Sequence, residues 1–142
     1  MQLSIRWRYI PFRLRHSKHR ERILKAVRST DSHPTADWIF GKVRKRIPNI
    51  SLGTVYRNLG QLVEYGLIQS RMIDGVVHYD GNLDDHQHFY CTCCHAIYDL
   101  DLPLEDPVSE MEARMKHDVH GYDLQLNGIC RTCREMNKNE RN

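Results

Sequence analysis

The segment SLGTVYRNLGQLVEYG, residues 51–66, decides how the first half of the chain folds. Its apolar residues recur at helical spacing from Leu52 onward, which predicts a helix with one buried face. Ser51 is a favourable N-cap, and Gly66 is a typical residue for ending a helix. Three polar side chains fall on the opposite face, Thr54, Arg57 and Gln61, with Asn58 beside them and Tyr56 at the boundary between the two faces. A short helix with this exposed chemistry suits the major groove of DNA, although an ordinary surface helix can carry the same residues.

Two further helices are predicted upstream. Ser17 is the expected N-cap of the first, whose apolar stripe contains Ile23, Leu24 and Val27. The second is expected to have Pro34 at its first position and to end at Pro48. Its apolar residues follow at i, i+3, i+4 and i+7: Ala36, Ile39, Phe40 and Val43.

Downstream, residues 67–80 contain two β-rich runs, LIQSRMI and VVHYD. The pair Asp74-Gly75 between them is a strong signal for a two-residue hairpin turn. Three helices followed by a hairpin predict a winged helix-turn-helix, in which Arg71 and His78 of the wing would meet phosphate.

The charge is divided unevenly along the chain. Residues 1–80 hold 15 Lys and Arg against 6 Asp and Glu, a net charge of +9, whereas residues 81–142 hold 6 against 12, a net charge of −6. Charge alone would also fit two solvated surfaces, but together with the helix order it favours DNA binding by residues 17–80, preceded by a basic arm at 1–16. Six residues are candidate contacts to double-stranded DNA: Arg20, Ser51, Thr54, Tyr56, Arg57 and Gln61.

All five cysteines lie in the acidic half, in the motifs CTCC and CRTC. The sequence has no secretory signal and no apolar run of roughly 18 residues, which predicts a soluble cytoplasmic protein. In such a protein, an odd number of clustered cysteines favours metal ligation over disulfides. Two C-x-x-C pairs that enclose 35 residues suit a tetrahedral structural zinc site. Its predicted ligands are Cys91, Cys94, Cys130 and Cys133, which leaves Cys93 as a bystander.

The residues between the two pairs are expected to form structure of their own. Asp106-Pro107 would open a helix that Gly121 closes, with one apolar side. Tyr122, Leu124 and Leu126 then alternate as a strand. The fold class predicted for the whole chain is therefore α+β, with an N-terminal winged helix-turn-helix and a small C-terminal α/β domain.

A second group of metal-ligand residue types is separate from the cysteines. His86 and His88 are spaced i, i+2, on one face of a strand. Asp80 precedes them, Asp99 follows the first cysteine pair, and His33 lies far upstream before Pro34. Considered singly, each of these residues is as well explained as a polar surface residue.

Taken together, four motifs resemble the ferric uptake regulator family, and most of all its peroxide-sensing branch. They are HPTAD, SLGTVYRNLGQLVEYGLI, the DHQH-x-x-CxxC run and the closing CxxC, and the resemblance covers Ser17 to Cys133. It implies a homodimer with a metal-sensing dimerisation domain at residues 81–135, followed by a polar tail at 136–142. It also implies a regulatory metal held by His33, Asp80, His86, His88 and Asp99.

The chemistry of this ligand set is coherent. Three imidazoles and two carboxylates suit Fe(II) or Mn(II), whereas thiolates favour zinc. Iron-sensing members typically have Glu where this chain has Asp80 and Asp99, so the resemblance favours a repressor that responds to peroxide. It implies oxidation of His33 or His86 in the iron form and an insensitive manganese form.

The sequence departs from the family pattern at three places. His95 follows Cys94 where the family usually has Gly. The short stretch before Cys130 lacks a histidine that belongs to an additional metal site in the family, so we predict no complete third site. Arginine at position 57 is more typical of iron-sensing members of the family than of some peroxide sensors.

Two alternatives remain open to test. The first is an iron, manganese or zinc homeostasis regulator of the same family. The second is a zinc enzyme, but a deaminase needs His-x-Glu and a following PCxxC, which the sequence lacks. A redox C-x-x-C would be expected beside a βαβ pattern. We therefore predict no enzymatic activity, no membrane association and no small-molecule substrate other than peroxide. The expected partners are double-stranded operator DNA and a second copy of the chain.

Overall fold

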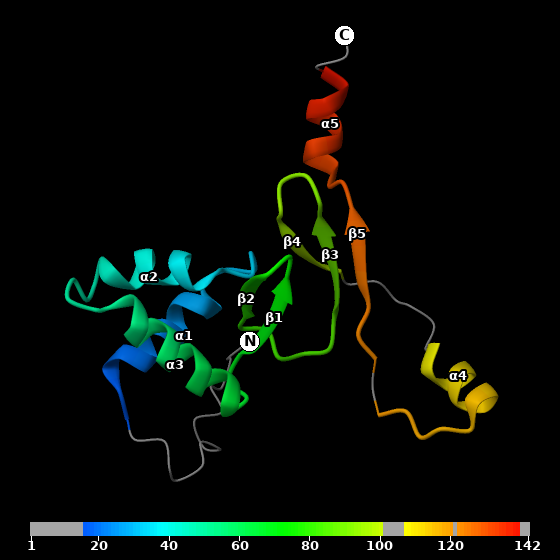
Figure 1. Ribbon diagram of the computed structural model, residues 1–142, viewed down its shortest axis with the longest axis horizontal. Helices are drawn as coiled ribbons and strands as arrows, with labels where there is room; N and C mark the ends of the chain where they lie inside the picture. Colours follow the sequence, from blue (N-terminus) through cyan, green and yellow to red (C-terminus); the bar gives the residue numbers. More distant parts are fainter. Residues whose placement is uncertain (1–15, 101–106, 121, 140–142) are drawn as a thin grey trace, which may run out of the picture. The chain divides into compact units, whose positions relative to one another are not determined.

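The computed structural model describes residues 16–100, 107–120 and 122–139, and the chain divides into two compact units, Met1–Leu83 and Asp84–Asn142 (Figure 1). Apart from its last residue, the predicted basic arm lies outside the described residues.

Three helices form the body of the N-terminal unit: α1 (Lys18–Arg28), α2 (Ala36–Arg44) and α3 (Leu52–Glu64). Each begins at a hydroxyl side chain that accepts a backbone N–H of the first turn: Ser17, Thr35 and Ser51. The caps of α1 and α3 are the predicted ones. Pro34, by contrast, lies before the α2 cap instead of inside the helix, because Thr35 has an extended backbone and its side chain caps the first turn. The carbonyl of Pro34 accepts a hydrogen bond from the N–H of Tyr79 at 2.9 Å. Likewise, α2 ends at Arg44, earlier than predicted.

The predicted hairpin is confirmed as strands β1 (Gln69–Ile73) and β2 (Val76–Asp80), which pair antiparallel. Asp74 and Gly75 both have positive φ angles, 50° and 79°, as a type I′ turn requires. One apolar core joins the helices to the hairpin, and its fully buried side chains are Ile23, Val27, Ile39, Val55, Leu59, Leu62 and Ile68. Burying each such side chain contributes about 1.5–3 kcal/mol. The N-terminal unit is therefore a winged helix-turn-helix.

The C-terminal unit is built on a three-stranded sheet: β3 (Gln87–Cys91), β4 (Ile97–Leu100) and β5 (Gln125–Gly128). The strand order is β4-β3-β5, with β4 antiparallel and β5 parallel to the central strand. Two helices complete it: α4 (Pro107–Met115) and α5 (Arg131–Asn139).

The elements of the C-terminal unit differ in extent from those predicted. Helix α4 stops at Met115, short of Gly121, because Lys116 adopts a left-handed φ of 55° that a helix cannot continue through. The predicted strand at residues 122–126 is displaced toward the second cysteine pair. Helix α5 extends to Asn139, so the predicted polar tail at 136–142 begins within this helix.

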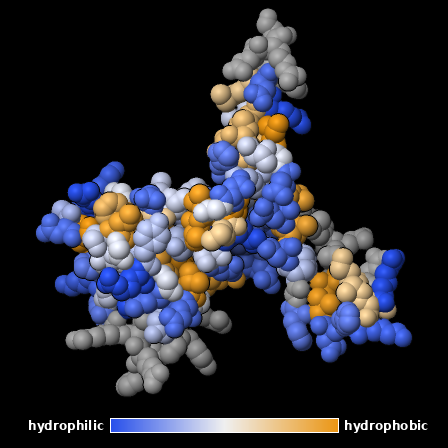
Figure 2. Space-filling model, in the orientation of Figure 1, coloured by the Kyte–Doolittle hydropathy of each residue, from blue (hydrophilic) through white to orange (hydrophobic). Residues whose placement is uncertain are grey.

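Few apolar side chains are buried in the described part of the C-terminal unit. Besides three of the cysteines, they are Tyr90 and Ile97. Figure 2 shows apolar residues at the surface of this unit, including the region of α4. The exposed large apolar residues are Tyr98, Met111, Met115, Tyr122, Leu126, Ile129 and Met136. A unit with so small a core needs further stabilisation.

Candidate metal centres and DNA-contacting helix

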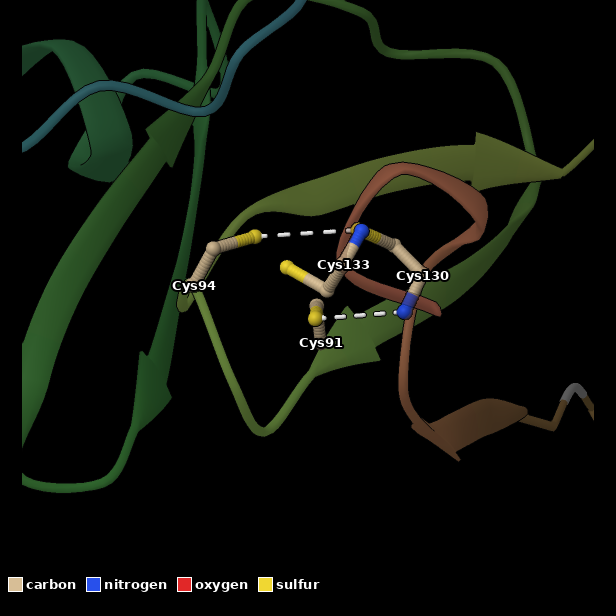
Figure 3. Close-up of side chains that lie close together, drawn as sticks. All are labelled: Cys91, Cys94, Cys130 and Cys133. Carbon is tan, nitrogen blue, oxygen red and sulfur yellow. Dashed lines mark hydrogen bonds between the residues drawn. The ribbon is translucent and has the colours of Figure 1, made fainter. Parts of the chain in front are cut away.

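The four predicted zinc ligands converge in the C-terminal unit. Cys91 ends β3 and Cys94 follows in the next turn, while Cys130 and Cys133 flank the start of α5. Figure 3 shows their sulfur atoms gathered into one cluster, and all four lie within 4.8 Å of one another. The Sγ atoms of Cys94 and Cys130 are 3.8 Å apart. Sulfurs bound tetrahedrally to one Zn²⁺ at about 2.3 Å would be separated by about 3.8 Å, so the cluster fits zinc.

Backbone donors favour the thiolate form of two of the four cysteines, Cys91 and Cys130. Hydrogen bonds with neighbouring sulfurs, that of Cys130 foremost, raise the pKa of Cys133, and the pKa of Cys94 is also raised although the backbone of Ala96 acts to lower it. The N–H of Cys130 donates to Cys91 Sγ at 3.2 Å, and the N–H of Cys133 donates to Cys130 Sγ at 3.5 Å. Hydrogen bonds from the backbone, that of Cys94 foremost, lower the pKa of Cys91 to about 6. A hydrogen bond to Cys130 raises the pKa of Tyr98 to about 12. The phenol therefore stays protonated and donates to this sulfur.

The turn that begins at Cys91 ends at His95, the residue after Cys94, where the family usually has glycine. His95 has a φ of 61°, in the left-handed region, and its N–H donates to the carbonyl of Cys91 at 2.9 Å. The Tyr90 hydroxyl lies 2.6 Å from His95 Nδ1. This side-chain contact helps to hold a backbone conformation that costs a non-glycine residue about 1–2 kcal/mol.

The N-terminal unit contains two of the predicted regulatory ligands, and they meet as a pair. His33 Nε2 lies 3.1 Å from Asp80 Oδ2, with the two side chains 3% and 13% exposed. The other carboxylate oxygen of Asp80 accepts the N–H of Asn82 at 2.8 Å. The ring of His78, a predicted phosphate contact, donates from Nδ1 to the carbonyl of His33 at 2.8 Å.

The C-terminal unit brings the other three together. His88 lies directly opposite Asp99 in the β3–β4 ladder. Asp99 Oδ1 is 3.2 Å from His86 Nε2 and 3.7 Å from His88 Nε2. His86, which immediately precedes β3, donates from Nδ1 to the carbonyl of Asp84, so its Nε2 is the atom directed at the carboxylate. Such a hydrogen bond fixes the tautomer of a metal-binding imidazole.

Helix α3 displays part of the predicted DNA-contacting set. Tyr56, which periodicity left at the boundary, is 48% exposed, and Arg57 is exposed beside it. Thr54 is half-buried, and its hydroxyl lies 2.8 Å from the Ser51 hydroxyl.

Two other polar residues of α3 have structural partners. Gln61 Oε1 accepts a hydrogen bond from Arg20 Nη2 at 2.6 Å, which links α3 to α1. Asn58, which we placed beside the exposed face, is buried and donates to the carbonyl of Thr54 at 2.8 Å.

A basic groove between α1 and α2 was not anticipated from single motifs. It has a volume of about 760 Å³, and its charged lining residues are all cations: Arg22, Lys25, Lys42, Lys45 and Arg46. The run KVRKR at 42–46 is the sequence signal that could have indicated it. The groove adds to the positive potential that attracts a polyanion to this unit.

Comparisons with known proteins agree with this architecture. The Ferric uptake regulator family model matches residues 12–127. The peroxide-responsive repressor PerR of Staphylococcus epidermidis is 31% identical over 124 residues, which cover 86% of this chain and 83% of the relative. The Campylobacter jejuni peroxide stress regulator is 30% identical with a TM-score of 0.68, over 81% of this chain and 88% of that one.

The fold itself is also shared with the Helicobacter pylori ferric uptake regulator, at a TM-score of 0.78 and 22% identity, over 85% of this chain and 83% of that one. The predicted fold class is thereby confirmed. Within the described ranges, none of the helices combines the length and the apolar character needed to cross a membrane. Members of the matched family are metal-responsive transcriptional regulators rather than enzymes. By its sequence and by its fold, this chain belongs to the ferric uptake regulator family.

Proposed function

We propose that the protein is a homodimeric transcriptional repressor that binds operator DNA in its metal-loaded form and is inactivated by peroxide. The observation that supports the proposal is that the predicted ligands of the regulatory metal are divided between the two units. The pair His33–Asp80 lies in the DNA-binding unit, and the group His86, His88 and Asp99 lies in the unit that contains the cysteine cluster.

One ion bound by both groups would couple the two units. Three imidazoles and two carboxylates suit Fe(II) or Mn(II), and the four cysteines would hold Zn²⁺ separately. Metal binding would then select one arrangement of the units from the available ensemble. A coupling free energy of roughly 1–3 kcal/mol would give about 5- to 150-fold control of operator affinity.

Peroxide sensing would depend on the imidazoles. If His33, Asp80, His86, His88 and Asp99 held Fe(II), the metal would activate peroxide for reduction beside the ligand rings. Transfer of one oxygen atom from peroxide to a ring C–H of His33 or His86, with water as the other product, would leave a ring that no longer binds the metal in the same geometry. Mn(II) does not readily reduce peroxide, so the manganese form would remain bound to operator DNA.

The DNA and dimer contacts come from different units. We assign DNA binding to residues 17–80, where α3 exposes Tyr56 and Arg57, with Ser51, Thr54, Gln61 and Arg20 as the remaining candidate contacts. We assign dimerisation to residues 81–135, whose exposed apolar side chains would be covered by a second copy. A regulator of this kind acts on DNA in the cytoplasm.

The decisive experiment compares the Fe(II) and Mn(II) forms before and after low peroxide. We expect operator binding to be lost in the iron form only, together with a gain of one oxygen atom on the peptide carrying His33 or His86, measured by mass spectrometry. Oxidation confined to Met and Cys, or equal insensitivity of both forms, would contradict peroxide sensing. The second result would favour a metal-homeostasis regulator.

A further inference from the structure

The loop that carries His33 is tied to β2 at three consecutive residues. His78 Nδ1 donates to the carbonyl of His33 at 2.8 Å, and the N–H of Tyr79 donates to the carbonyl of Pro34 at 2.9 Å. Asp80 then meets the His33 ring at 3.1 Å. A single strand thus holds both the backbone and the side chain of a predicted metal ligand.

The backbone of His33 explains why such a clamp is needed. Its φ is 52°, in the left-handed region that side-chain-bearing residues rarely adopt. The α regions are further disfavoured for a residue that precedes proline, here Pro34. Conformations of this kind persist only where surrounding contacts hold them. Of the two hydrogen bonds described here from β2 to this loop backbone, that of His78 comes from a side chain, so it depends on residue identity.

We propose that His78 is a positioning residue for the regulatory metal site. By donating to the His33 carbonyl, its ring orients the loop so that His33 and Asp80 are presented as a preformed ligand pair. The proposal rests on the proposed function in one respect, namely that this pair binds the regulatory metal.

The same strand connects the pair to the wing. Strand β2 pairs with β1 along the hairpin, where His78 lies opposite Arg71, and it forms an isolated bridge to Thr35 at the start of α2. A shift of the His33 loop would therefore act directly on both the wing and α2. His78 lies at the junction of these contacts.

The test uses full-length, zinc-loaded protein and two substitutions. His78→Asn keeps a side-chain N–H donor at a similar distance from the backbone, whereas His78→Phe keeps a ring but removes the hydrogen-bond donor. Mn(II) affinity is measured from the electron paramagnetic resonance signal of free Mn(II). We expect H78F to weaken Mn(II) binding by about 10- to 100-fold, the usual effect of losing a residue that orients a metal ligand. H78N should remain within about threefold of the unsubstituted protein.

His19→Phe is the matched control, since His19 is an exposed histidine of α1 in the same unit. It should leave Mn(II) affinity unchanged, and zinc content should be the same in all variants. Equal weakening by H78N and H78F, or unchanged affinity in H78F, would overturn the proposal.

A metal-free measurement separates this inference from the proposed function. Amide hydrogen exchange in residues 33–36 should be faster in H78F than in H78N without any added Mn(II). If His33→Ala leaves Mn(II) affinity unchanged, the proposed function fails. The exchange result still decides whether His78 holds the loop, and equal exchange in the two variants would refute that role.

Discussion

Ser51 shows how a single side chain can serve both the fold and the proposed function. Its hydroxyl accepts the N–H of Thr54 at 3.1 Å and so caps α3, the helix expected to enter the major groove. The N-terminal turn of that helix also contains Thr54. Capping and DNA contact at this position can be separated by choosing substitutions that change one of them.

Replacing Ser51 should therefore give different results for stability and DNA binding. Ser51→Ala should lower the free energy of unfolding by about 1 kcal/mol, because the cap is lost. Ser51→Asp should keep the cap but weaken operator binding by placing a negative charge near phosphate. Urea unfolding and fluorescence anisotropy measure the two effects. Ser51→Asn, a neutral cap, is the control, and equal operator affinity of S51D and S51N would contradict the predicted location of DNA.

Arg57 is the exposed cation best placed on α3 for direct contact with bases. We expect Arg57→Ala to reduce operator affinity by about 1–3 kcal/mol with little change in the free energy of unfolding. Arg131→Ala removes the same charge from α5, where the side chain is 89% exposed, and serves as the control. If R131A weakened binding as much as R57A, the effect would reflect net charge and not a contact from α3.

At the scale of elements, the N-terminal unit depends on close packing between helices and the hairpin. The hairpin contributes Tyr79 to the core, and Arg28 at the end of α1 donates to the carbonyl of Leu67 at 3.0 Å. Gly81, which follows β2, approaches the same end of α1. A Cβ at Gly81 would lie 2.8 Å from Cγ and 3.1 Å from Cα of Arg28.

Substitution of Gly81 should consequently destabilise the N-terminal unit. We expect Gly81→Ala to lower its free energy of unfolding by about 1–3 kcal/mol, since the backbone of α1 must move to make room. Gly60→Ala, in α3, is the control, because nothing lies within 4 Å of a Cβ there. It should stabilise the helix by up to about 1 kcal/mol. Chemical denaturation measures both, and unchanged stability of G81A would show that the close approach is not maintained.

At the scale of the whole molecule, the two units differ in what stabilises them. The N-terminal unit has a continuous apolar core, whereas the buried apolar cluster of the C-terminal unit is made largely of cysteines: Cys91, Cys130 and Cys133, with Phe89 packed against them. Zinc would join β3 to the start of α5 and so replace the missing core.

Removal of zinc should therefore affect the two units unequally. We expect chelation, or Cys94→Ser, to abolish protection from hydrogen exchange in β3, β5 and α5, while α1 to α3 keep theirs. Cys93→Ser is the matched control, as it removes the neighbouring exposed thiol that we assign no role. Retention of zinc and of exchange protection in C94S would contradict the four-cysteine site, whereas loss of zinc in C93S would give Cys93 a role.

The sequence by itself determined the local features of this protein. Hydroxyl caps at Ser17 and Ser51, the Asp74-Gly75 turn and the helical periodicity of α3 depend on residues a few positions apart, so they could be predicted from the chain alone. The two C-x-x-C pairs were equally clear, because each pair has the spacing of a zinc knuckle.

Only the tertiary structure decided which distant residues meet. The family resemblance, and not spacing along the chain, predicted that Asp80 and His33 share a site across 47 positions, whereas no pattern predicted that Gln61 pairs with Arg20 across 41. Periodicity also misplaced Asn58, whose burial depends on its neighbours in the packed unit. The role of His78 was missed for the same reason. Contacts of this kind form when packing brings together residues that are far apart in the sequence. Spacing along the chain does not predict which side chains then face each other.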